Sequence, residues 1–382
     1  MTGARGSLVV ARYGEVHLKG KNRGLFLRQL TQNLRAAAPG CNVELKNDRY
    51  VVVSPADYTI YSVANVFGIT SASKVMEVKH DEILGELAKL DFSGKTFRVN
   101  VNRADKKFPH TSMTFSAMCG EVILKNNAVA DGRVAARVDL HNPQMTINID
   151  IREGDVAYLY TDTVAGVGGL PVGVSGKALV LISGGIDSPV AAWLAAKRGM
   201  RVELLHFASP PYTNAAALDK VKRLRDKLVP YCGAVPLHVV NLTPVLAEIK
   251  SKCNEAYMIT LMRRFMVRIA RKMCLDRHID CIVTGENLAQ VASQTIEGIT
   301  TNNVLACEVP ILRPLITYDK SEIITVAKRI GTYDVSIEPH ADCCTVFVPE
   351  SPIIAPTIRA CEREEGHLDV DGLILGLDIS HF

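Results

Sequence analysis

The sequence has no apolar run that approaches the roughly 20 residues that a membrane helix needs. Its apolar runs, such as residues 178–182, are short and bounded by glycine, lysine or polar residues. The first seven residues lead directly into a strand-like segment, without the apolar stretch of a secretory signal. We therefore expect a cytoplasmic protein with no membrane partner.

Cysteine motifs are also scarce. No C-x-x-C pair occurs among the ten cysteines, which argues against the usual zinc and iron–sulfur ligand spacings but leaves open a metal site assembled from distant residues. The net charge of +4 over 382 residues is too small to indicate nucleic-acid binding by itself. What remains is an ordinary globular composition, 48% hydrophobic and 22% charged, with room for two or three domains.

The chain divides into two parts with different periodicity. Residues 1 to about 165 predict an α+β region, with strands at 8–12, 43–45, 50–53, 97–101 and 145–151 and helices around 26–34 and 112–125. A glycine-rich connection follows at 166–176. From Ala178 onward, apolar strands at 178–182, 202–207, 237–240 and 281–284 alternate with longer helical patterns, which predicts a parallel sheet covered on both faces.

The strongest motif is a polar, glycine-containing loop between the strand ending at Ile182 and a helix expected to begin at Pro189. It consists of Ser183, Gly184, Gly185, Ile186, Asp187 and Ser188. Glycines let the backbone approach a ligand, and successive N–H groups at a helix N-terminus form an anion site. A plain turn with a helix cap is the alternative, and it would be preferred for two glycines alone.

A Walker A loop does not fit this region. Lys177 precedes the strand, and it is followed by Ala178 rather than by the serine or threonine that would bind magnesium. The loop at 183–188 itself contains no lysine. It therefore lacks the group that a Walker A loop places near the β and γ phosphates.

The motif S-G-G-x-D-S between strand and helix resembles the PP-loop of ATP pyrophosphatases. Further segments in the same order resemble the tRNA 4-thiouridine synthetases, also called tRNA uridine 4-sulfurtransferases, over essentially the whole chain. They are residues 14–23, 150–152, 157–160, 168–173, 205–207, 262–264, 285–294, 313–315 and 319–320.

The resemblance implies an α/β PP-loop domain with a parallel sheet, of the adenine nucleotide alpha hydrolase type, preceded by α+β ferredoxin-like and THUMP domains. We place the ferredoxin-like domain at 1–57, the THUMP domain at 58–165, a linker at 166–177 and the PP-loop domain at 178–382. The implied reaction is ATP-dependent transfer of sulfur to uridine in tRNA through an adenylated uridine, which gives 4-thiouridine.

Site residues follow from the resemblance position by position. ATP, with Mg²⁺, would be bound by Leu181, Ile182, Ser183, Gly184, Gly185, Asp187, Ser188, His206, Phe207, Arg263, Gly285 and Gln294. Asp187 and Lys320 would position metal and phosphates, and no protein motif indicates a further metal site. Lys320 lies at a predicted helix N-terminus, where a cation is mildly unfavourable and a phosphate partner would explain it.

Sulfur handling is expected at Cys344, with Cys343 at most its helper. Long members of the family carry a rhodanese domain with a persulfide-bearing cysteine, and we expect none here because too few residues follow Cys344. A cysteine desulfurase or another persulfide donor would then supply the sulfur. The family's link to sulfur for the thiamine thiazole depends chiefly on the rhodanese part and stays open, as does a homodimer.

Basic residues in the first region are candidates for tRNA binding. They are Lys19, Lys21, Arg23, Arg103, Lys106 and Lys107. A solvated surface is the alternative, but the resemblance favours recognition of tRNA by its shape and backbone. Rival functions are another PP-loop tRNA thiolase, an amide-forming ATP pyrophosphatase and a non-catalytic tRNA-binding protein. A THUMP methyltransferase would need a glycine motif for S-adenosylmethionine, which we do not find.

Overall fold

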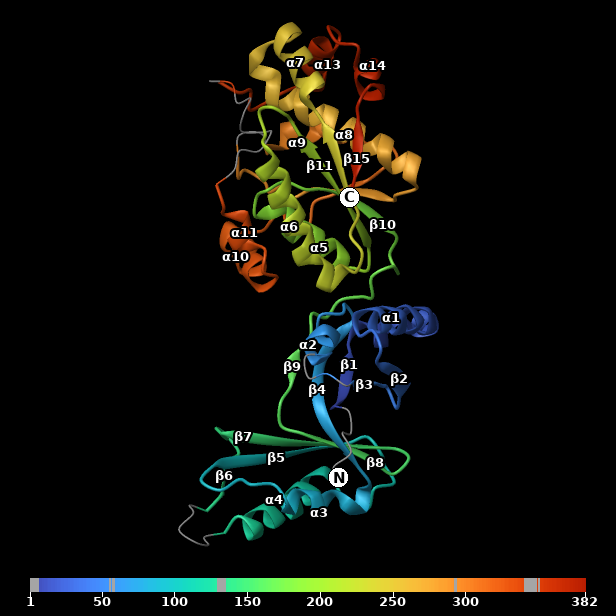
Figure 1. Ribbon diagram of the computed structural model, residues 1–382, viewed down its shortest axis with the longest axis vertical. Helices are drawn as coiled ribbons and strands as arrows, with labels where there is room; N and C mark the ends of the chain where they lie inside the picture. Colours follow the sequence, from blue (N-terminus) through green and yellow to red (C-terminus); the bar gives the residue numbers. More distant parts are fainter. Residues whose placement is uncertain are drawn as a thin grey trace. The chain divides into compact units, whose positions relative to one another are not determined.

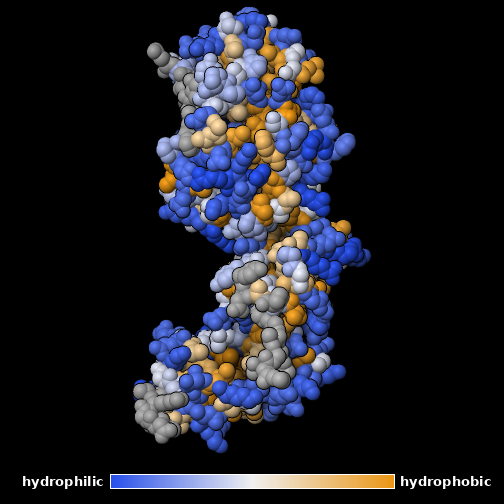
Figure 2. Space-filling view, viewed as in Figure 1, coloured by the Kyte–Doolittle hydropathy of each residue, from blue (hydrophilic) through white to orange (hydrophobic). Residues whose placement is uncertain are grey.

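The computed structural model describes residues 7–54, 56, 59–128, 135–291, 294–339, 349 and 351–382. The chain forms two compact units, Met1–Gly168 and Gly169–Phe382 (Figure 1). No helix within the described ranges has the length and apolar character needed to cross a bilayer. The face shown in Figure 2 is largely hydrophilic, with apolar residues gathered in smaller areas.

The first unit is built on a nine-stranded sheet in the order β2-β3-β1-β4-β8-β7-β5-β6, with β9 paired to β4. Its long strand β4 pairs with β1 through residues 69–75 and with β8 through residues 76–78, so it belongs to both halves of the sheet. The strands are β1 Ser7–Tyr13, β2 Asn42–Lys46, β3 Arg49–Ser54, β4 Ile69–Val78, β5 Thr96–Arg103, β6 Arg137–Val138, β7 Met145–Arg152, β8 Val156–Tyr160 and β9 Val164–Ala165.

Two large hydrophobic cores lie on this sheet, beside a small cluster of Val10, Val51 and Tyr158. The first core joins β1 to α1, where Leu30 and Leu34 are buried as the helical pattern predicts. It also includes α2 and the start of β4, which the sequence analysis placed in the THUMP domain. The second core joins α3 and α4 to β5 and β7. The helices are η1 Glu15–Asn22, α1 Arg23–Ala37, α2 Thr59–Ala64, η2 His80–Glu82, α3 Ile83–Ala88 and α4 Ser112–Asn126.

The second unit contains the expected parallel sheet, in the order β14-β13-β10-β11-β12-β15. Its first five strands are parallel, and only β15 is antiparallel. The strands are β10 Lys177–Leu181, β11 Arg201–Ala208, β12 Leu237–Asn241, β13 Cys281–Val283, β14 Ile311–Leu312 and β15 Ile379–His381. The chain runs outward from β10 to β12 and then returns to the other side of β10, which creates a switch point between β10 and β13.

Helices cover both faces of this sheet. On one face α8 is the central element, and its apolar residues form the core with α7 and strand residues such as Leu179 and Leu205. The pair α5 and α6 packs together against β10 and β11. The helices are α5 Asp187–Lys197, α6 Ala215–Cys232, α7 Thr243–Lys252, η3 Glu255–Tyr257, α8 Met258–Arg277, α9 Ile296–Asn303, α10 Lys320–Arg329, α11 Tyr333–Ser336, α13 Ile358–Glu365 and α14 Val370–Leu375.

Candidate nucleotide site at the ends of β10 and β13

The predicted phosphate loop lies at the switch point of the second unit. It connects the carboxyl end of β10 to α5, which begins at Asp187, two residues before the predicted Pro189. The loop that follows β13 lies at the same edge of the sheet. Open α/β sheets bind ligands in the crevice outside the carboxyl ends of the strands at such a point. The topology therefore places the predicted loop at the position where such sheets bind ligands.

Hydrogen bonds within the loop fix its curved shape. The hydroxyl of Ser188 accepts from the Ser183 amide at 2.9 Å and lies 3.1 Å from the Ser183 hydroxyl. The Ser183 hydroxyl in turn accepts from the amide of Gly185 at 3.3 Å. Both serines are thus used to hold the backbone in place, and the glycines between them leave that backbone open to a ligand.

Gly285 brings the second loop into contact with the first. A Cβ at this position would lie 2.8 Å from the Ser188 nitrogen and 3.0 Å from the Asp187 carbonyl carbon, both backbone atoms. Only a residue without a side chain allows the loop after β13 to approach the first turn of α5 so closely. This contact joins two predicted site segments that are about 100 residues apart in the sequence.

An ion pair between Asp187 and Lys320 lies at the edge of the phosphate loop. The Lys320 ammonium donates to Oδ1 of Asp187 at 2.5 Å, and the amide of Gln290 donates to Oδ2 at 2.9 Å. Lys320 begins α10, as predicted, and Asp319 caps that helix by accepting from the Glu322 amide. The protein partner that Lys320 has here is therefore the carboxylate of Asp187.

Arg263 is held by an acidic partner at the same edge. Its guanidinium donates to Glu286 Oε1 at 2.9 Å, and Arg313 donates to Oε2 at 2.7 Å. Thr284 donates to the same carboxylate at 3.0 Å. The three charged side chains are 10% to 19% exposed, so Arg263 lies in a partly buried network rather than in solvent.

The remaining predicted nucleotide residues lie mostly below the surface. His206 is 4% exposed and its Nδ1 lies 3.1 Å from the Ile182 carbonyl oxygen, so it links two neighbouring strands. Phe207 is 5% exposed and packs in the core with Leu181 at its border. Gln294 is buried, and its backbone carbonyl accepts from the Ala289 amide at 2.9 Å. These three side chains are therefore packed inside the second unit rather than exposed at its surface.

Comparisons with known proteins match each part of this architecture. A family described as thiamine biosynthesis protein (ThiI) matches residues 173–370, the ThiI ferredoxin-like domain matches 8–73, and the THUMP domain matches 81–162. The "Probable tRNA sulfurtransferase" of Brevibacillus brevis is 42% identical over 380 residues, covering 96% of this chain and 93% of the relative. The protein of the same name from Finegoldia magna is 42% identical over 384 residues, covering 95% and 94%.

The chain belongs to the tRNA sulfurtransferase family. A solved 4-thiouridine synthetase–RNA complex with bound ATP is similar over 98% of this chain and 99% of that one, with 34% identity and a TM-score of 0.86. PH1313 from Pyrococcus horikoshii Ot3 is 25% identical, with a TM-score of 0.64 over 85% of this chain and 99% of that one. The predicted fold, with ferredoxin-like, THUMP and PP-loop domains, is confirmed.

Other residues around the family's loop were not singled out by the sequence. Lys220 of α6 is 5% exposed, and its ammonium donates to the carbonyls of Ser336 and Glu338 at 2.8 and 2.7 Å. Its Cδ lies 3.4 Å from where a Cβ on Gly184 would be. Ser336 donates to the Gly185 carbonyl at 3.3 Å. A lysine in the middle of a helix carries no local signal for such a role, whereas Glu286 and Gln290 lie within the quoted segment 285–294.

The cysteines of this unit differ in what the structure shows. Cys343 and Cys344 lie outside the described residues. Burial raises the pKa of Cys232 and Cys274 to about 12 and that of Cys281 to about 11. Since the thiolate is the reactive form of cysteine, burial keeps these three thiols unreactive.

The predicted tRNA-binding residues of the first unit fall into two groups. Lys21, Lys106 and Lys107 are exposed, and the Lys19 ammonium lies 5.2 Å from the centre of the Phe26 ring. By contrast, Arg23 donates to Asp48 at 2.5 Å, and Arg103 donates to the carbonyls of Phe108 and His110. The two arginines therefore stabilise local structure, while the exposed lysines are accessible to a ligand.

A pocket of about 570 Å³ lies next to this basic segment. Its lining includes Lys107, Phe108 and His110 together with the carboxylates of Asp81 and Asp105. The mixture of acidic, basic and aromatic groups differs from a simple phosphate site. The exposed lysines beside the pocket remain the most direct candidates for contacts with a nucleic-acid backbone.

Proposed function

We propose that this chain uses ATP to transfer sulfur from a persulfide to uridine in tRNA, giving 4-thiouridine. The observation that carries this proposal is the phosphate loop at the β10–β13 crevice, with Asp187 and Lys320 paired at its edge. The likeness to a 4-thiouridine synthetase solved with RNA and ATP supports it, at 34% identity and a TM-score of 0.86.

The first step would activate the base. Uridine O4 attacks the α phosphorus of ATP, a P–O bond to the β phosphate breaks, and the products are adenylated uridine and pyrophosphate. The amides of residues 183–188 and the N-terminus of α5 stabilise the negative charge on the phosphates. Lys320 is on a flexible stem and can move from Asp187 to a phosphate oxygen.

A Mg²⁺ ion bound with ATP fits the residues present. Asp187 offers a carboxylate, the ligand type that Mg²⁺ prefers, at the edge of an anion site. When bound, the ion would neutralise charge on the phosphates. The movement of Lys320 from Asp187 to phosphate would free the carboxylate for this contact.

The second step would deliver sulfur. The terminal sulfur of a persulfide on Cys344 attacks C4, AMP leaves with the O4 oxygen, and Cys344 becomes linked to C4 through a disulfide. A second thiol attacks the Cys344 sulfur, which releases the thiocarbonyl and leaves a protein disulfide. An external dithiol reduces that disulfide before the next turnover. A cysteine desulfurase or another persulfide donor loads Cys344.

The first unit would hold the tRNA. Lys19, Lys21, Lys106 and Lys107 provide charges that neutralise backbone phosphates without reading bases. The first unit has its own two cores, as expected for a binding module that positions a substrate for the chemistry of the second unit.

Mass spectrometry of tRNA nucleosides from a deletion strain tests the proposal. Loss of 4-thiouridine, restored by this chain, would support it. Loss of a 2-thiouridine with intact 4-thiouridine would instead favour another PP-loop thiolase, and unchanged thionucleosides would favour an amide-forming enzyme or a binding protein. Growth of the same strain without thiamine tests whether the chain also supplies sulfur for the thiazole.

A further inference from the structure

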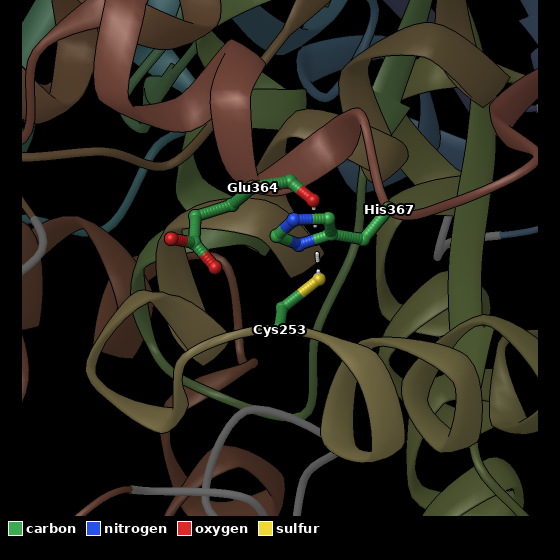
Figure 3. A group of neighbouring side chains, drawn as sticks. All are labelled: Cys253, Glu364 and His367. Carbon is green, nitrogen blue, oxygen red and sulfur yellow. Dashed lines mark hydrogen bonds between the residues drawn. The ribbon is translucent and has the colours of Figure 1, made fainter.

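Three side chains with metal-binding atoms meet on the second unit, outside the nucleotide crevice. Cys253 follows the last residue of α7, Glu364 lies in the last turn of α13, and His367 follows that helix. One ligand atom of each lies within 4.8 Å of the other two. Figure 3 shows the three residues next to one another, with the Cys253 thiol hydrogen-bonded to the backbone carbonyl of Glu364.

The backbone holds this group in place. The Cys253 thiol donates to the Glu364 carbonyl at 3.4 Å, and the Asn254 amide donates to Oε2 of Glu364 at 2.8 Å. The His367 amide donates to the Glu364 carbonyl at 3.2 Å, which continues the helical turn. Glu364 and His367 therefore have the i, i+3 relation by which helices present two ligands to one metal ion.

The neighbouring charged residues that the structure describes do not form ion pairs with Glu364 or His367. Glu365, the next residue, pairs with Arg264 and Arg268. Within the described ranges, Glu364 has no ion pair and the ring of His367 has no hydrogen bond. A carboxylate, an imidazole and a thiol therefore lie close together, and each still has an atom that can bind a metal ion.

We propose that Cys253, Glu364 and His367 bind one divalent cation of the zinc class, with water in the fourth position. Zinc takes sulfur, nitrogen and oxygen ligands together, at about 2.0 to 2.3 Å, in a tetrahedral arrangement. On binding, the thiol loses its proton to solvent and the sulfur forms the bond to the metal.

Such an ion would tie two parts of the second unit together. α13 and α14 pack on α8 near the C-terminal end of the chain, and the Arg264–Glu365 pair already joins α13 to α8. The metal would add a second link, from α13 to the end of α7. Binding should therefore raise the thermal stability of the second unit.

Cobalt binding tests the site directly. The full chain is freed of metal with a chelator and titrated with Co²⁺, whose thiolate complexes absorb in the near ultraviolet. We expect one Co²⁺ per chain with this band and its loss when Zn²⁺ is added. Adjacent Cys343 and Cys344 also attract metals, so the titration is repeated in a chain carrying Cys343→Ser and Cys344→Ser.

The variants assign the ligands. In that background Cys253→Ser should remove the thiolate band, and His367→Ala or Glu364→Gln should weaken Co²⁺ binding at least about tenfold. Cys307→Ser, at an exposed cysteine outside the cluster, serves as the matched control and should change nothing. A band of equal intensity and affinity in Cys253→Ser, or no band in the background chain, overturns the proposal.

Thermal unfolding separates metal binding from a folding defect. Zn²⁺ should raise the Tm of the background chain and leave the Tm of its Cys253→Ser variant unchanged. Without metal, the two chains should have the same circular dichroism and Tm. If Cys253→Ser does not fold, the Zn²⁺-induced change in Tm is measured on Glu364→Gln instead, and this change should be smaller than in the background chain. An equal Zn²⁺-induced shift with and without the three ligands contradicts the site.

Discussion

Asp187 is the residue at which the two sides of the crevice meet. It accepts from Lys320 at the start of α10 at 2.5 Å and from Gln290 in the loop after β13 at 2.9 Å. We predict that Asp187→Ala abolishes tRNA-dependent release of pyrophosphate, because the carboxylate no longer orders the lysine or a metal ion. Affinity for tRNA should stay within a few-fold, since we propose that the first unit holds the RNA. Pyrophosphate assays and a binding titration measure the two effects.

Lys320→Ala should act on the same step. Lys328→Ala, at an exposed lysine near the other end of α10, is the matched control and should keep the wild-type rate. If Lys320→Ala adenylates tRNA normally but transfers sulfur slowly, the lysine serves the second step instead.

Gly285 offers a purely steric test of the crevice. A methyl group there would meet backbone atoms of residues 187 and 188 at 2.8 to 3.0 Å, so Gly285→Ala must displace the loop after β13 or the start of α5. Misplacement by about 1 Å can cost about 100-fold in rate. We therefore expect a loss of that order in pyrophosphate release. Gly120→Ala, where a methyl group meets open space, should be harmless.

Cys344 is the predicted sulfur-handling thiol, and burial makes several other cysteines poor alternatives. The pKa of Cys119 is raised to about 12 by burial, like those of Cys232 and Cys274. Given ATP, tRNA and a desulfurase loaded with labelled sulfur, Cys344→Ser should release pyrophosphate but form no 4-thiouridine. Normal thiolation by this variant would shift the assignment to Cys343.

At the scale of elements, a buried ionic group joins α8 to α13. Arg264 is fully buried, and with Arg268 it binds the carboxylate of Glu365, which is 6% exposed. Burial alone would raise the pKa of Glu365, but the hydrogen bonds from Arg268 and Arg264 hold it at about 2. A carboxylate whose pKa is lowered on folding stabilises the folded state as long as it is ionised.

Glu365→Gln should therefore lower the free energy of unfolding by about 3 to 5 kcal/mol at neutral pH, because it leaves the buried guanidinium of Arg264 and the partly buried one of Arg268 without their carboxylate partner. The contribution of Glu365 is complete above its ordinary pKa of 4.5 and declines as the pH falls toward 2. Urea unfolding of both chains at pH 7 and pH 3 measures this. The difference between them should shrink at pH 3, and the exposed Glu362→Gln should show none.

Elements with a strong local pattern were predictable. The structure confirms the apolar strands predicted at 178–182, 202–207 and 237–240, whose ends differ by no more than one residue. It also confirms the amphipathic helix predicted around 26–34, which extends three residues further at each end. Strand β15 was not predicted, because its three residues gain order only by pairing with β12, about 140 residues earlier. The Arg263–Glu286–Arg313 network was missed for the same reason, since its partners come from three separate segments.

At the scale of the whole molecule, the sequence predicts the boundary between the two units better than it predicts the boundary between domains within the first unit. The glycine-rich segment 166–176 contains the observed division between Gly168 and Gly169. Within the first unit, β4 continues from one half of the sheet into the other, so the two halves share hydrogen bonds. The sequence carries no sign of such sharing, because burial along residues 69–78 follows no regular alternation that would mark one long strand.

We predict that a fragment of residues 1–168 binds tRNA by itself, because this unit contains both of its cores and the exposed Lys21, Lys106 and Lys107. Its affinity should fall with salt, and each lysine that neutralises a phosphate should contribute about −0.7 to −0.9 to the slope of log K against log salt. Lys21→Ala and Lys106→Ala should each make the slope shallower by that amount, whereas Lys125→Ala on α4 should not. Filter binding across a salt series measures the slopes. A fragment that does not bind, or binds independently of salt, would place the electrostatic contacts with tRNA on the second unit.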